Sequence, residues 1–155
     1  MRKFRIASLA APLALIACAQ AAAASTIEVM KNPNCGCCGV WVERMREAGF
    51  IVNVQEMADT SEVASAAGIP ANLRSCHTAK VEGYAIEGHV PAEDIRTLIA
   101  LKPDAVGLAV PGMPLGSPGM EVPGRAETYQ VVLVAKDGNH RVFATHKGTA
   151  DAHVH

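Results

Sequence analysis

Three of the five cysteines in this chain fall within four positions, at Cys35, Cys37 and Cys38. Cys35 and Cys38 have the C-x-x-C spacing of thioredoxin-like redox sites, and Cys37 adds a third sulfur to the same turn. A third thiolate favours a soft metal ion, Cu(I) above all, because thiolate sulfur is a soft ligand. The spacing therefore predicts a turn that either carries out redox chemistry or binds copper.

The segments around this turn predict a βαβ unit. An apolar run at 27–30 precedes the turn, apolar residues recur at helical spacing over 40–48, and an alternating strand follows over 50–55. This order places the sulfurs at a helix N-terminus, where the macrodipole and the unpaired N–H groups stabilise thiolates. Redox chemistry and metal binding both need thiolates, so the placement does not separate them. The residues expected in the core of this unit are Trp41, Met45 and Phe50.

The rest of the chain predicts a compact α/β domain with a long loop. The further expected elements are a helix over 59–68, strands over 75–81 and 84–87, a helix over 91–102, and a hairpin with strands over 129–134 and 141–145. Between them, residues 103–124 contain five prolines, five glycines and two methionines, with no usable periodicity. A loop of this length inside a compact domain usually has a function.

The first 24 residues have the composition of an export signal. A positive n-region, an apolar h-region too short to span a bilayer and a run of small residues follow one another. We therefore predict a periplasmic protein. Two routes of processing are open: cleavage to a soluble product, which we favour, and lipid anchoring at Cys18, because 15–18 resembles a lipobox.

Charge and hydropathy exclude two classes of partner for the mature chain. Removal of residues 1–24 leaves 11 basic against 15 acidic residues, a net charge of −4, which argues against nucleic acid. No other stretch approaches the ~18 apolar residues of a membrane span, so we predict no transmembrane segment in the mature chain.

Cys76 is the fourth cysteine of the mature chain, at the start of the third expected strand. In a thioredoxin-like fold this segment passes beside the C-x-x-C turn, usually through a cis-proline, and no proline stands there in this sequence. Cys76 would instead supply a fourth sulfur. His77 should point to the opposite face of the strand, so we leave it out of the ligand set.

Two methionines and one histidine are further candidate ligands. Met113 and Met120 lie in the Gly/Pro-rich loop, and their thioethers could bind copper without deprotonation or could simply cover apolar surface. His89 precedes the last core helix, whose start faces the cysteine turn in thioredoxin-like folds; it is either a ligand or a residue that hydrogen-bonds backbone. His153 and His155 fit a solvated tail better than a metal site.

Four motifs resemble one family over about residues 26–146. They are Cys35-Gly36-Cys37-Cys38-Gly39, Ser75-Cys76-His77-Thr78, Glu87-Gly88-His89-Val90-Pro91 and Pro111-Gly112-Met113-Pro114-Leu115-Gly116-Ser117-Pro118-Gly119-Met120-Glu121. Together they look like the CopG-type periplasmic copper-resistance family, long filed only as a metal-binding domain of unknown function. The resemblance implies a thioredoxin-like core whose cysteines hold a multinuclear copper cluster through bridging sulfur. It also implies a role in handling Cu(I) and Cu(II) during copper stress.

We therefore predict a thioredoxin-like α/β domain over 25–146, with a Gly/Pro/Met-rich loop insertion and a C-terminal β-hairpin. A signal peptide over 1–24 precedes the domain, and a flexible histidine-containing tail over 147–155 follows it. The predicted function is periplasmic copper binding for copper resistance, with several Cu(I) ions as the metal and other periplasmic copper-handling proteins as partners. The predicted metal ligands are Cys35, Cys37, Cys38, Cys76, His89, Met113 and Met120.

Two other functions stay open at this point. The first is a thiol–disulfide oxidoreductase, with Cys35 as nucleophile and Cys38 as resolving thiol; a copper-dependent oxidoreductase would be the enzymatic form of the copper hypothesis. The second is a binding domain stapled by two structural disulfides, as an exported chain with four cysteines could be. Bridges within the cysteine turn would close only tiny loops, so they would constrain the unfolded chain little.

Overall fold

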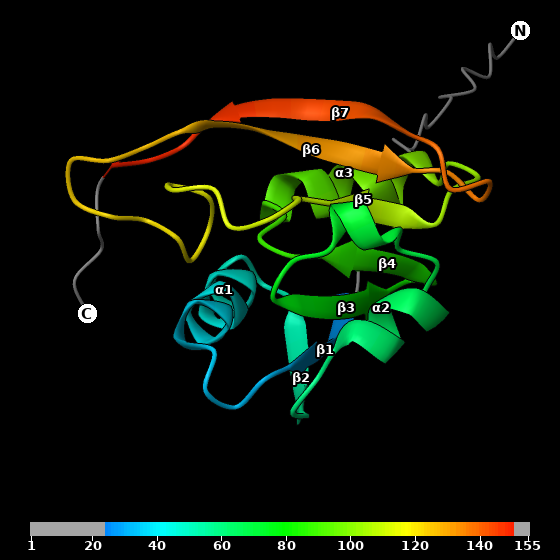
Figure 1. Cartoon of the computed structure of the whole chain (residues 1–155), viewed down its shortest axis with the longest axis horizontal. Coiled ribbons are helices and arrows are strands. Elements are labelled where there is room, and N and C mark those ends of the chain that lie inside the picture. Colours follow the sequence, from blue (N-terminus) through cyan, green and yellow to red (C-terminus); the bar gives the residue numbers. More distant parts are fainter. Residues whose placement is uncertain (1–23, 151–155) are drawn as a thin grey trace, which may run out of the picture.

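One mixed sheet of seven strands runs through residues 24–150, which are the residues that this computed structural model describes (Figure 1). Its strand order is β2-β1-β3-β4-β5-β6-β7. The elements are β1 (Thr26–Lys31), α1 (Gly36–Glu47), β2 (Ile51–Glu56), α2 (Ser61–Ala66), the 3₁₀ helix η1 (Ala71–Leu73), β3 (His77–Val81), β4 (Tyr84–Glu87), α3 (Ala92–Leu101), β5 (Gly107–Ala109), β6 (Thr128–Val134) and β7 (His140–Lys147).

The first four strands and three helices form the thioredoxin-like core. β1 pairs in parallel with β2, as the predicted βαβ unit requires, and antiparallel with β3, which pairs antiparallel with β4. Helix α1 connects β1 to β2, and α3 follows β4. The predicted fold class is therefore confirmed, including the hairpin of β6 and β7 at the C-terminal end.

Helices cover both faces of the sheet. On one face, α1 and α3 bury Trp41, Met45 and Ile95 in a core that also includes Phe50. On the other face, α2 and η1 pack a smaller apolar cluster against β4, β5 and β6. The three residues expected in the core from their spacing are all buried, with Trp41 completely so. Burial of this aromatic side chain fixes α1, and hence the cysteine turn at its start, on the sheet.

The sequence suggested one continuous loop over residues 103–124, but the structure divides this segment. It contains β5, which pairs in parallel with β4 and antiparallel with β6. A strand of three residues is too short to show a periodicity, and all three of its residues are buried. β5 joins the thioredoxin-like core to the C-terminal hairpin, so the loop insertion that bears on the site begins only after Ala109.

Several boundaries differ from the expected ones by a few residues. β3 begins at His77, so Cys76 lies just before the strand and not in it. At the C-terminal end, Thr149 donates a backbone hydrogen bond to Gly116, and the carbonyl of Ala150 accepts one from Gly124. This part of the expected tail therefore packs against the loop insertion.

The predicted export signal, apart from Ala24, lies outside the described residues, as do His153 and His155. Among residues 24–150, no helix has the length and apolar character needed to cross a membrane.

The close approach of β4 and β5 gives a first prediction. A Cβ added at Gly107 would lie 1.8 Å from the carbonyl oxygen of Ala85, and backbone cannot move aside as a flexible side chain can. We expect Gly107→Ala to break this pairing and to lower the free energy of unfolding by more than about 2 kcal/mol. Urea denaturation of the copper-free protein measures the loss.

Gly138→Ala is the matched control for Gly107→Ala. Gly138 has a φ of +83° in the hairpin turn, and a Cβ added there would meet no heavy atom within 4 Å. Alanine there should cost only the left-handed backbone strain, about 1 kcal/mol. Equal losses for the two variants would contradict the role assigned to the contact between β4 and β5.

Candidate metal centre

The segments that carry the predicted ligands meet at one end of the sheet. The register pairs Lys31, at the end of β1, with His77, at the start of β3. Because β3 is antiparallel to both β1 and β4, these two strands leave the sheet where β3 enters it. β5 is parallel to β4 and leaves at the same end. The cysteine turn, Cys76, His89 and the loop insertion are therefore neighbours.

Helix α1 begins within the cysteine turn. Cys35 is its N-cap residue, with extended backbone, and the Cys35 carbonyl accepts a hydrogen bond from the Gly39 N–H at 3.3 Å. The turn is closed by the side chain of Asn32, whose oxygen accepts from the Asn34 N–H at 2.9 Å. No acidic residue stands in the first turn of α1. The positive end of the helix dipole is therefore available to the cysteine sulfurs.

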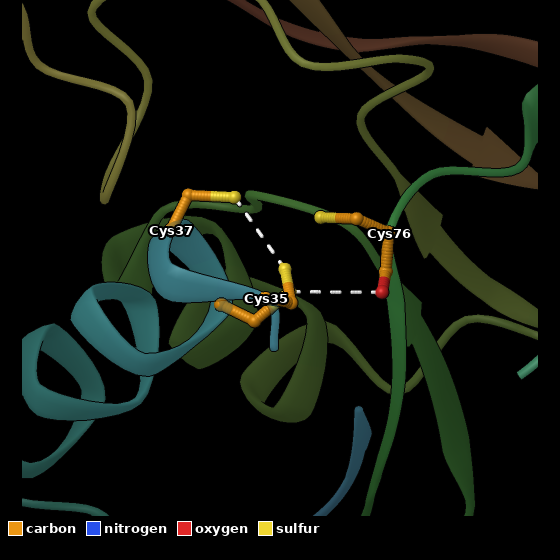
Figure 2. A group of neighbouring side chains, drawn as sticks. Cys35, Cys37 and Cys76 are labelled. Carbon is orange, nitrogen blue, oxygen red and sulfur yellow. Dashed lines mark hydrogen bonds between the residues drawn. A yellow bond between two sulfur atoms is a disulfide. The ribbon is translucent and has the colours of Figure 1, made fainter. Parts of the chain in front are cut away.

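The four cysteines of the described chain converge on one site. Their sulfur atoms all lie within 4.8 Å of one another. A disulfide joins Cys35 to Cys38, whereas Cys37 and Cys76 are free thiols. The Cys37 sulfur lies 3.5 Å from that of Cys35. Figure 2 shows Cys37 and Cys76 pointing toward each other, from the first turn of α1 and from the segment before β3.

Cys76 occupies the position that the sequence assigned to a fourth sulfur donor. The Cys38 sulfur lies 3.6 Å from the Cys76 carbonyl oxygen, so the segment before β3 touches the disulfide directly. Burial, with a further contribution from Cys37, raises the pKa of the Cys76 thiol to about 11. Without a cation nearby, this thiol keeps its proton at neutral pH. A metal ion would displace the proton, because its charge favours the thiolate.

His89 is completely buried beside Cys76. Its Nδ1 lies 2.8 Å from the carbonyl oxygen of Pro118, which can only accept, so Nδ1 carries the hydrogen. Its Nε2, left with a lone pair, lies 3.1 Å from the Cys76 sulfur. Burial lowers the pKa of His89. The sequence offered a backbone hydrogen bond and a ligand position as alternatives. The ring is compatible with both, because Nδ1 makes the hydrogen bond and Nε2 keeps a lone pair.

His77 belongs to this group, although strand alternation placed it on the opposite face. Its Nδ1 lies 3.5 Å from the Cys76 sulfur, and ligand atoms of Cys76, His77 and His89 lie within 4.8 Å of one another. The expectation was wrong because β3 begins at His77, so the pleat of the strand does not relate it to Cys76. Burial lowers the pKa of His77 to about 3, which leaves a neutral imidazole. Its direct adjacency to Cys76 was the signal that could have revealed it.

The two methionines lie in the loop insertion. Met113 is 53 % exposed, and Met120 is partly exposed. The contacts described for residues 24–150 do not bring either thioether to the four sulfurs. Their assignment as copper ligands therefore stays a prediction.

Backbone groups of the loop insertion, in contrast, cover the cysteine turn. Gly119 packs so closely on α1 that an added Cβ would lie 2.8 Å from the Cys37 carbonyl oxygen and 2.9 Å from the Trp41 backbone nitrogen. Glu121 accepts a hydrogen bond from the Gly119 N–H at 2.8 Å and pairs with Arg44 of α1 at 3.3 Å. These contacts hold the loop on the first three turns of α1.

Glu87 holds the segment that contains Cys76. Its buried carboxylate accepts hydrogen bonds from the Ser75 N–H and from the Thr78 hydroxyl, each at 2.7 Å. The two donors flank Cys76 and His77, so one carboxylate fixes the path of the chain across the site. Burial raises the pKa of Glu87, although both hydrogen bonds oppose the shift.

The fold and these contacts define a thioredoxin-like domain with a thiol-rich candidate metal site. A family model described as a protein of unknown function, DUF411, matches residues 73–120. Comparison with curated proteins gives no match.

Two solved structures resemble the chain over nearly all of their own length. One is titled copper resistance protein CopG, Form 2, with 45% identity, a TM-score of 0.76, and coverage of 79% of this chain and 98% of that chain. Form 1 gives 45% identity, a TM-score of 0.74, and coverage of 78% and 96%. The chain belongs to the CopG-type copper-resistance family, as its four motifs predicted. Family membership and the group of cysteines support a copper-related role.

The contact between the loop insertion and α1 gives a second prediction. Gly119→Ala would force the loop away from α1, while Gly112→Ala meets no atom within 4 Å; both glycines have positive φ, +87° and +71°. Both variants therefore carry similar backbone strain, and only Gly119→Ala adds a clash. We expect it to be about 1–3 kcal/mol less stable than Gly112→Ala in urea denaturation.

A second measurement on the same pair of variants tests whether the loop insertion shields the cysteine turn. Lifting the loop from α1 should expose Cys37, so alkylation of this thiol should be faster in Gly119→Ala than in Gly112→Ala. Equal stability and equal alkylation rates would show that the loop does not cover the cysteine turn.

The buried carboxylate of Glu87 gives a third prediction. Because burial raises its pKa, the fold prefers the protonated form. Its contribution to stability is fully present below the unfolded pKa and is lost as the pH rises through the higher folded value. Glu87→Gln removes this titration. We therefore expect the stability of the wild type relative to the variant to fall as the pH rises from about 4, the ordinary value for a glutamate, through the higher folded pKa, measured by urea denaturation without copper. A difference that is constant with pH would contradict it.

Proposed function

We propose that this protein binds several Cu(I) ions through bridging thiolates of Cys35, Cys37, Cys38 and Cys76. The observation that carries the proposal is the approach of all four sulfurs to within 4.8 Å of one another. With metal–sulfur bonds of about 2.3 Å, the length typical of zinc thiolates, one ion can join two sulfurs up to about 4.6 Å apart. Once the disulfide is reduced, side-chain movements would bring sulfurs at this spacing into range to share metal ions.

The donor set favours Cu(I) over the other common metal ions. Thiolates are soft ligands and select Cu(I), and a group of four can hold more than one such ion when each sulfur bridges. Membership of a copper-resistance family supports copper as the metal. The predicted export signal supports the periplasm as the place of action.

Reduction of the Cys35–Cys38 disulfide is the first requirement of this function. A dithiol reductant would supply the two electrons and two protons that convert it to thiols, and would itself become a disulfide. Metal binding then releases protons as thiolates form. The N-terminus of α1 favours the negative charge of the cysteines in the turn. Cys76, whose pKa is about 11, loses its proton to solvent at neutral pH only when a cation takes its place on the sulfur.

His89, Met113 and Met120 are further donors in this proposal. His89 already presents Nε2 at 3.1 Å from the Cys76 sulfur. Met113, at 53 % exposure, would have to turn inward from the loop insertion. A neutral imidazole and uncharged thioethers would add ligands without adding negative charge to a site that already holds four thiolates.

A second candidate function is thiol–disulfide exchange, favoured by the Cys35–Cys38 disulfide at the N-terminus of α1. In that function Cys35 would be the nucleophile and Cys38 the resolving thiol. Cys37 weighs against it, because a free thiol 3.5 Å from the Cys35 sulfur would compete in each exchange step. Cycling of bound copper between Cu(I) and Cu(II) would be the redox form of the copper function.

Anaerobic copper titration tests the proposed function and gives a fourth prediction. The reduced protein, titrated with Cu(I) against a strong competing chelator, should retain two or more ions per chain. Cys76→Ser should lower that number, because it removes one bridging sulfur. Retention of fewer than one ion by the wild type would overturn the proposal. An unchanged copper count in Cys76→Ser, together with a disulfide reductase activity that Cys35→Ser abolishes, would establish thiol–disulfide exchange instead.

A further inference from the structure

We propose that the disulfide form of the chain has a second copper site, made by Cys76, His77 and His89, which takes a single ion. The proposal rests on the proposed function for the choice of copper, but not for the multinuclear cluster. None of these three residues takes part in the disulfide. The site is therefore intact in a state in which two of the four sulfurs cannot bind metal.

The distances suit one metal ion. The Cys76 sulfur lies 3.1 Å from His89 Nε2 and 3.5 Å from His77 Nδ1, and ligand atoms of all three residues fall within 4.8 Å of one another. With metal–nitrogen bonds of about 2.0 Å and a metal–sulfur bond of about 2.3 Å, trigonal coordination separates sulfur from nitrogen by about 3.7 Å. Movements of a few tenths of an ångström would admit the ion.

Contacts on the far side of each ring hold the two histidines in place. The Pro118 carbonyl accepts from His89 Nδ1 at 2.8 Å and directs the Nε2 lone pair to Cys76. Hydrogen bonds of this kind fix metal-binding histidines in many proteins. The His77 ring is completely buried between Trp41, with ring centroids 4.5 Å apart, and His89, at 5.2 Å. Trp41 is itself anchored by a hydrogen bond from its ring nitrogen to the Val90 carbonyl at 2.9 Å.

One nitrogen of His77 has no partner in the described part of the chain, although Nδ1 contacts the Cys76 sulfur. Its Nε2 is buried and has no hydrogen-bond partner among residues 24–150. A buried polar side chain without a partner is costly, so a structural role alone would not favour a histidine at this position. Use of the Nδ1 lone pair by a metal ion would give this histidine a role that an apolar residue could not fill.

The two sites differ in chemistry and share Cys76 and His89. Four thiolates favour Cu(I), whereas two imidazoles and one thiolate form the donor set of proteins that hold copper in both oxidation states. Because Cys76 belongs to both sites, a chain can use only one of them at a time. Disulfide formation between Cys35 and Cys38 would therefore lower the copper capacity to one ion and make the remaining site able to hold Cu(II).

X-ray absorption of the wild-type chain tests this proposal directly. The disulfide form is loaded with one equivalent of Cu(I) without oxygen. In a parallel sample, alkylation of the two free cysteines followed by mass spectrometry verifies that the disulfide is present. We expect a copper ion with one sulfur and two nitrogen neighbours. Coordination by two or more sulfurs, or failure to bind copper, would overturn the second site.

Parallel measurement of the reduced chain separates the two proposals. A sulfur-dominated environment with short copper–copper distances supports the cluster. If the reduced chain holds fewer than two ions while the disulfide form shows the nitrogen-rich environment, the cluster is wrong and the second site stands. If the cluster forms and the disulfide form binds nothing, only the second site is wrong.

Histidine variants test the assignment of the ligands. His77→Gln should bind copper at least about 10-fold more weakly in the disulfide form and should leave the copper count of the reduced chain unchanged. His146→Gln is the matched control, because His146 lies on β7 and pairs with Asp94 of α3 at 2.6 Å. Equal affinities in the two variants would exclude His77 as a ligand. If His77→Gln does not fold, the wild-type absorption spectrum decides the matter without it.

Discussion

The antiparallel pairing of β1 with β3 is the interaction on which the whole site depends. In its register, Lys31 lies opposite His77. The cysteine turn, which follows β1, therefore begins beside Cys76, which precedes β3. Residues 38 positions apart thereby touch, with the Cys38 sulfur 3.6 Å from the Cys76 carbonyl. A shift of this register by one residue would turn the buried face of β3 outward and separate the sulfurs. Packing of Trp41 and the buried carboxylate of Glu87 then hold both sides of the contact in place.

Several metal-ligand atoms of the site are buried in forms that carry no charge. Burial keeps the Cys76 thiol protonated and the two histidines neutral, and it leaves one nitrogen of His77 without a partner among the described residues. A cation would reverse this balance, since it stabilises thiolates and uses the lone pairs of neutral imidazoles. We infer that the same arrangement connects copper binding to the redox state of the thiols. Reduction would supply four thiolates. The Cys35–Cys38 disulfide leaves the thiols of Cys37 and Cys76, of which Cys76 is grouped with the two imidazoles.

Strong local patterns made much of the fold predictable, and tertiary geometry limited the rest. The thiol spacing at Cys35 and Cys38, and the helical recurrence of Trp41 and Met45, identified the thioredoxin-like unit. β5 was missed because three residues carry no periodicity, although the apolar run 105–110 was visible. His77 was excluded by alternation along a strand that in fact begins one residue after Cys76. The loop insertion was expected to approach the site through methionines, but its described contacts with α1 are made by Gly119 and Glu121.

The central claim is that the thiol state of one site decides how much copper it holds. Native mass spectrometry of a half-reduced sample, equilibrated with excess Cu(I) without oxygen, measures this in a single spectrum, since the two redox forms differ by two hydrogen atoms. The account predicts two or more copper ions on chains with reduced Cys35 and Cys38, and one ion on chains with the disulfide. The same copper count on both forms would contradict it.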